Sequence, residues 1–129
     1  MRTLTDRATK ILWEILSLRT SKVDRSNGAY PPLTVEIINE TPDWRVISLA
    51  HYADNDLKAQ PEICFLHDRK TDNVFPYYYR NDFVGITSQS MKFEDGRVFM
   101  LDLAIQNEHA SLANLWLYTI AKQQNIIAP

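Results

Sequence analysis

Cysteine, glycine and long apolar runs are all scarce in this sequence, and each scarcity excludes a class of protein. The 129 residues include a single cysteine, which excludes an internal disulfide and a cage of thiolate ligands around zinc. Three glycines and six prolines exclude a collagen-like or low-complexity chain. The longest apolar runs span a few residues, far short of the roughly 20 that cross a bilayer. We therefore expect stability to come from core packing, with no membrane partner.

The composition and the first residues of the chain predict one cytoplasmic domain. Apolar residues make up 45% and charged residues 23%, which excludes a chain that is disordered for lack of hydrophobic surface. Arg2, Asp6, Arg7 and Lys10 stand where a secretory signal needs an apolar stretch. The length fits a single domain over residues 1–129.

Charge is unevenly distributed, although the net charge is only −2. Residues 1–30 carry six basic groups against three acidic ones, and the remainder carries eight against thirteen. A field strong enough for non-specific nucleic-acid binding is therefore not predicted. Arg2, Arg7, Lys10 and Arg19 could still contact phosphates locally, or they could form the solvated face of a helix.

Apolar periodicity predicts a helix at each end of the chain. Residues 4–19 place apolar side chains at spacings of three and four. A second helix is predicted over residues 103–124, with a broad apolar face formed by Leu112, Leu115, Trp116, Tyr118 and Ile120. This face is expected to pack on a sheet.

The segment between the helices reads as antiparallel strands. Alternating or β-rich runs occur at residues 33–40, 44–52, 62–68, 74–79, 86–93 and 97–101. Residues 21–32 are predicted to form a loop, and residues 54–61 a polar turn. The order helix, strands, helix predicts an α+β fold, in which an antiparallel sheet of about four to six strands carries both helices on one face. The expected core includes Ile11, Ile15, Val35, Ile37, Phe65, Leu112 and Trp116.

The sequence contains no motif for a phosphate-binding loop, a nucleophilic cysteine or a catalytic serine. The three glycines are isolated, so no loop that cradles a phosphate is formed, and no cofactor is predicted. Cys64 stands in an apolar strand, where a thiol is buried and inert. Ser88 and Ser90 have no base next to them in sequence. These features favour a binding protein over an enzyme.

One polar cluster is a candidate for a metal-assisted or acid–base site. Its members are His51, Asp54, Asp56, Glu62, His67 and Asp82. Carboxylates beside imidazoles suit a divalent metal, which would make the chain a hydrolase. The spacing matches no known metal motif, so no metal site is assigned, and the same residue types also cap turns.

The run Tyr77, Tyr78, Tyr79 and Arg80 is the most unusual local feature. In a regular strand, Tyr77 and Tyr79 share one face and Tyr78 takes the other. Pro76 indicates an edge strand or a bulge. Tyrosine and arginine are enriched at protein interaction hot spots and also stack on unpaired bases. We expect a protein partner or a second copy of the chain to dock here, and nucleic acid is an alternative.

Short motifs in residues 45–120 resemble those of small bacterial domain families of unknown function. The matching pieces are His51-Tyr52, Asn55-Asp56-Leu57, Pro61-Glu62, Phe65-Leu66, Asn81-Asp82-Phe83-Val84-Gly85 and Trp116. The resemblance implies the same α+β arrangement and a bacterial or mobile-element origin. The function that we expect is that of a small accessory or regulatory protein, such as a mobile-element inhibitor of a host defence complex.

Overall fold

The computed structural model describes residues 1–53 and 58–127. It contains two long helices and eight strands within that part of the chain. In chain order these are α1 (Asp6–Ser17), β1 (Lys22–Val23), β2 (Leu33–Glu40), β3 (Trp44–Ala53), β4 (Lys58–Asp68), β5 (Val74–Asn81), β6 (Ile86–Gln89), β7 (Met91–Glu94), β8 (Arg97–Met100) and α2 (Leu103–Gln123). Over the described residues, neither helix has both the length and the apolar composition of a membrane span.

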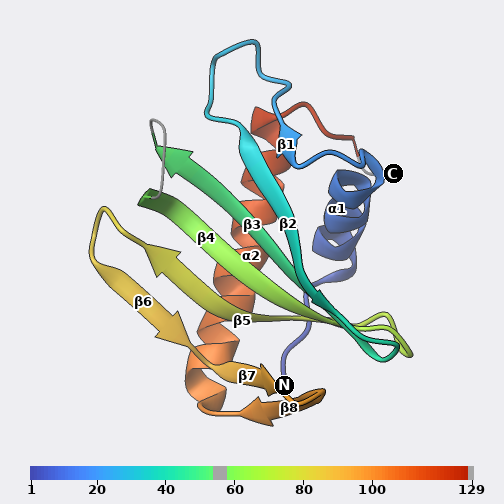
Figure 1. Cartoon of the computed structure of the whole chain (residues 1–129). Coiled ribbons are helices and arrows are strands. Elements are labelled where there is room, and N and C mark those ends of the chain that lie inside the picture. Colours follow the sequence, from blue (N-terminus) through green and yellow to red (C-terminus); the bar gives the residue numbers. More distant parts are fainter. Residues whose placement is uncertain (54–57, 128–129) are drawn as a thin grey trace.

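Six strands form one antiparallel sheet in the order β1-β2-β3-β4-β5-β6, and β7 and β8 form a separate hairpin at one end of it (Figure 1). Every pairing joins neighbours in the chain, as expected of a meander of hairpins. Helix α2 crosses behind the sheet in Figure 1. The predicted α+β class, with an antiparallel sheet flanked by an N-terminal and a C-terminal helix, is confirmed.

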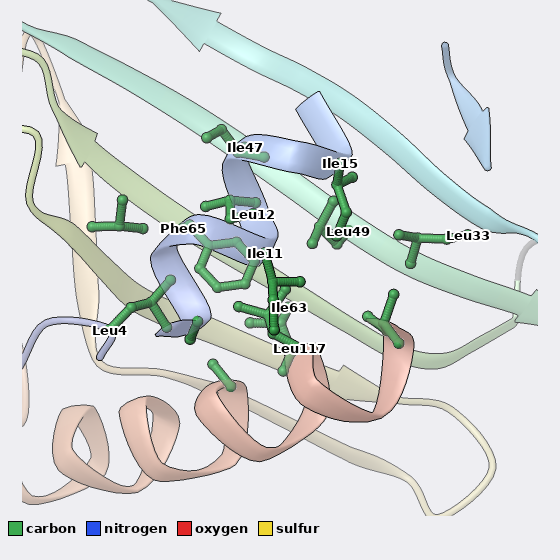
Figure 2. Packing of buried hydrophobic residues seen from close by; sticks show 14 of the residues in the cluster. Leu4, Ile11, Leu12, Ile15, Leu33, Ile47, Leu49, Ile63, Phe65 and Leu117 are labelled. Atoms are coloured by element: carbon green, nitrogen blue, oxygen red, sulfur yellow. The ribbon is translucent and has the colours of Figure 1, made fainter. Parts of the chain in front are cut away.

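The main core lies between the two helices and one face of the sheet. Figure 2 shows Leu12 and Ile15 of α1 and Leu117 of α2 meeting Ile47 of β3 and Phe65 of β4, and all five are buried. Thr5 caps α1, because its side-chain oxygen accepts a hydrogen bond from the backbone N–H of Ala8. An apolar stripe of α1 and one face of α2 therefore pack against the sheet and hold the helices in place.

Part of the predicted core is wrong. Ile11, Ile15 and Phe65 are buried, and Val35 and Trp116 are half-buried against the core, but Ile37 is 40% exposed and Leu112 is 39% exposed. Ile37 lies beyond the short strand β1 and next to a register shift in β2, so β2 is the edge of the sheet at this residue.

The predicted apolar face of the last helix is wrong in part, because Ile120 is buried and Trp116 packs against the core, but the other three members are exposed. Leu115 is 70% exposed and Tyr118 is 37% exposed. The face that packs on the sheet consists of Gln106, His109, Ala110, Ala113, Leu117 and Ile120. The residues of this face follow the helical spacing of three and four. Two of the six are polar, so the hydrophobicity of the sequence predicted that another side of α2 packs on the sheet.

Two further expectations about the strands need correction. Lys58–Pro61, expected in a polar turn, belongs to β4. Lys22–Val23, expected in a loop, forms β1. Neither segment shows the alternation of apolar and polar residues that predicts a strand. Each is a strand because its backbone pairs with a neighbouring strand, β1 with β2 and β4 with β3.

The face of the sheet opposite the helices is covered at one end only. There the β7–β8 hairpin packs on the sheet through Val46, Leu66, Phe75 and Met91, with Trp44, Tyr77, Phe93 and Val98 around them. The other end of this face holds the residues described next.

Candidate functional site on the helix-free face of the sheet

Two rows of paired residues cross the helix-free face. One row runs Glu36, Ser48, Cys64, Tyr78 and Gln89, and the other runs Thr34, Ala50, Glu62, Arg80 and Thr87. Directly paired residues in a sheet point to the same side, so each row forms a line of adjacent side chains. The side chains at the centre of both rows are small and buried: Ser48, Ala50 and Cys64 are each under 5% exposed.

Larger side chains surround these small residues. Tyr52 lies two residues beyond Ala50 on β3 and therefore continues the same face. Tyr52, Tyr77 and Tyr78 are half-buried, which leaves part of each ring open to solvent. We call the group Tyr52, Glu62, Tyr77, Tyr78, Arg80 and Asp82 the tyrosine face.

A β-bulge decides which tyrosines belong to this face. Cys64 pairs with Tyr78 and Phe65 pairs with Pro76, so Tyr77 is an extra residue without a partner in β4. The extra residue brings Tyr77 to the side of Tyr78, where it packs on the hairpin cluster, whereas Tyr79 packs into the helix-side core. The prediction that Tyr77 and Tyr79 share a face is therefore wrong.

The bulge, and not an edge, is the correct interpretation of Pro76. Strand β5 lies between β4 and β6, and Tyr78 to Asn81 pair with β6. Docking of another chain onto a free edge at the tyrosine run is thus excluded. The carbonyl of Pro76, just before the bulge, accepts a hydrogen bond from the side chain of Gln106.

Arg80 lies between two carboxylates. Its Nε atom is 3.5 Å from Oε1 of Glu62 and 3.7 Å from Oδ2 of Asp82. The other oxygen of Glu62 accepts a hydrogen bond from the Ser48 hydroxyl, and Oδ2 of Asp82 accepts one from the backbone N–H of Ala59 at 2.8 Å. The two acids are therefore held in place by the strands, with a single cation between them.

Burial keeps the hydroxyl and thiol groups of this face in their neutral forms. Burial, followed by the charge of Glu62, raises the pKa of Tyr52 and Tyr78. Burial also raises the pKa of Cys64 to about 12. Tyr52 and Tyr78 consequently keep their hydroxyl protons to a higher pH than a free tyrosine does, and Cys64 is a thiol without nucleophilic character.

The structure does not bring the six members of the polar cluster together. Glu62 and Asp82 meet at Arg80, but His51 points to the helix side, where its ring lies 5.6 Å from that of Trp116. His67 lies at the far end of β4, with Nε2 2.9 Å from Oδ1 of Asp72. Asp54 and Asp56 lie outside the described residues. Within residues 1–53 and 58–127, no group of three acidic, histidine or cysteine side chains is placed to hold a metal ion.

A hydrogen-bonded histidine between two serines was not found from the sequence. Nε2 of His109 lies 2.7 Å from the hydroxyl of Ser88, and Nδ1 lies 2.8 Å from the hydroxyl of Ser90. Because the Ser90 hydroxyl donates to the carbonyl of Tyr77, it accepts from Nδ1–H, and Nε2 is left to accept from Ser88. Burial lowers the pKa of His109, which is 4% exposed. His109 lies on α2, about twenty residues after Ser88 and Ser90, so no short sequence motif joins the histidine to the two serines.

The comparisons with known proteins identify a family. The family described as a domain of unknown function, DUF6908, matches residues 3–126, and the chain belongs to it. No curated protein and no solved structure matches the chain.

Proposed function

We propose that this protein is a binding protein without catalytic activity, and that the tyrosine face binds a protein partner. One observation supports the proposal: the three half-buried tyrosines of this face lie beside the charged group of Glu62, Arg80 and Asp82, and both surround small, buried residues. Rings held rigidly by strands bury much area at little cost in entropy, and tyrosine and arginine dominate interaction hot spots.

The charge of the face supports a partner segment with lysine or arginine side chains. Along the two rows and their ends, the three acids Glu36, Glu62 and Asp82 outnumber the two cations, Arg80 and Lys22 beside Thr34. A cation from the partner can stack on a tyrosine ring beside these acids. The same surplus of negative charge would repel phosphates, which disfavours a nucleic acid at this face.

The alternative of a metal-assisted hydrolase has less support. His51 and Glu62 lie on opposite faces of the sheet, and His67 lies against Trp13 near α1, with ring centres 4.8 Å apart. An accessory role, such as inhibition of a host defence complex by a plasmid or phage protein, belongs to the same proposal, since such a role needs a surface for protein binding.

A selection of displayed peptides tests the proposal. Random peptides are selected on the full chain and counter-selected on the double variant Tyr52→Ala/Tyr78→Ala. We expect enriched peptides to contain lysine or arginine, and the double variant to bind them at least about 30-fold more weakly, because one hot-spot truncation costs on the order of 2 kcal/mol. Arg80 is left intact, since its removal would leave two carboxylates unpaired.

A matched control is Tyr30→Ala, which removes a tyrosine that is 45% exposed in the loop before β2. The control is expected to bind the selected peptides like the wild type. Equal binding by the wild type and the double variant would refute the proposal, provided that both melt at similar temperatures. Selection of acidic peptides would refute the argument from charge, and displacement of the peptides by single-stranded DNA would favour the nucleic-acid alternative.

A further inference from the structure

A second surface of the molecule, on the helix side, gathers two cations around one aromatic ring. The guanidinium of Arg7 lies 4.7 Å from the ring centre of Tyr118, and the ammonium of Lys122 lies 4.5 Å from it. Arg7 comes from the first turn of α1, and Lys122 comes from the last turn of α2. The ring and both cations line a pocket of about 310 Å³, which extends to Ile126 and Ile127.

Neither cation has a counter-ion in the described part of the chain. The ion pairs among residues 1–53 and 58–127 involve other side chains, and no carboxylate oxygen of these residues lies within 4.0 Å of the charged nitrogens of Arg7 or Lys122. Lys92 makes a useful comparison, because it also lies over an aromatic ring but has a Glu94 oxygen at 3.3 Å. The Tyr118 pocket therefore holds two positive charges that repel each other and that a shared anion would neutralise.

We propose that this pocket binds a small phosphate monoester with an apolar or aromatic group attached. A phosphate monoester carries a charge of nearly −2 at neutral pH, which matches two cations, and its oxygens accept hydrogen bonds from both. The apolar group would lie against Ile126, Ile127 and the Tyr118 ring. A volume of about 310 Å³ is at the lower end of the range for small-molecule sites, so the ligand is small.

Phenyl phosphate is the probe for this site. Amide resonances of the full chain are followed by NMR during titration with phenyl phosphate, inorganic phosphate and phenol. We expect saturable shifts at residues around Tyr118 with phenyl phosphate, weaker binding of inorganic phosphate, and none of phenol, in the range of about 1 mM that a few contacts support. Binding is expected to weaken as salt is raised, because the cations are exposed.

Variants distinguish binding in the pocket from attraction of the anion to any exposed cation. Arg7→Gln/Lys122→Gln should weaken phenyl phosphate binding at least tenfold, and Arg7→Lys should retain most of it. Lys10→Gln removes an exposed cation from the same helix that does not line the pocket, and should leave binding unchanged. All these positions are exposed, so the variants are expected to fold. No saturable shift around Tyr118, or equal binding by Arg7→Gln/Lys122→Gln and the wild type, would overturn the proposal.

Discussion

Gln106 of α2 is expected to contribute more to stability than its polar side chain would suggest. The side chain is fully buried and makes three hydrogen bonds to segments distant in the sequence. Its carbonyl oxygen accepts from the N–H of Arg2 at 2.6 Å. Its amide nitrogen donates to the carbonyls of Arg2 and Pro76, at 2.7 and 3.2 Å. One side chain therefore joins the N-terminal segment and β5 to α2.

Gln106→Leu keeps a similar volume and removes all three bonds. With roughly 1 kcal/mol for each buried hydrogen bond lost, the free energy of unfolding should fall by about 3 kcal/mol. For a domain of this size, that loss lowers the melting temperature by about 10 °C. Urea denaturation followed by circular dichroism measures the first quantity, and a thermal scan measures the second.

Gln123→Leu is the matched control for this substitution. Gln123 is on the same helix and half-buried, and it makes no side-chain hydrogen bond within the described residues. The control should change the free energy of unfolding by less than about 0.5 kcal/mol. If Gln106→Leu costs no more than the control, the three bonds do not hold the segments together, and the reasoning is refuted.

Three further outcomes are expected. Burial lowers the pKa of His51 and His109 from 6.5, so the folded state binds protons less readily than the unfolded state. The contribution of these two histidines to stability should be constant above about pH 6.5 and fall below it, and a melting temperature that does not fall towards pH 5 would contradict this. Cys64, buried and with a pKa of about 12, should not react with a thiol reagent until the protein is unfolded in denaturant, and rapid labelling of the native protein would contradict its burial. Asp102→Ala removes the side chain that caps α2 and should cost about 1 kcal/mol in urea denaturation, where no loss would show that the cap is dispensable.

Local patterns were sufficient for most of the elements. The period of three and four over residues 4–19 and the alternation over residues 33–40 come from backbone geometry, because a helix turns every 3.6 residues and a strand alternates at every residue. The structure confirms the α+β class that follows from their order. Hydrophobicity alone shows the buried side of the first helix, whereas on the strand it fails at Ile37, which is exposed.

The buried side of α2 could not be found in the same way. Gln106 and His109 lie on it, while Leu112 and Leu115 face solvent. A polar side chain is stable in the core only when partners satisfy its hydrogen bonds, and those partners come from distant segments, such as Pro76 for Gln106 and Ser90 for His109. The hydrophobicity of a residue depends on its own side chain alone, so it cannot show that a distant segment will satisfy the hydrogen bonds of that side chain.

The candidate site was found only in part for a related reason. The sequence pointed to Tyr78, Arg80, Glu62 and Asp82 in two separate hypotheses, and pairing of β4 with β5 places all four on one surface. The side that Tyr77 takes depends on one extra residue opposite β4, which alternation within a single strand cannot reveal. Composition and period thus determined the elements, and the register between strands decided which side chains meet, because register depends on contacts between segments and not on either segment alone.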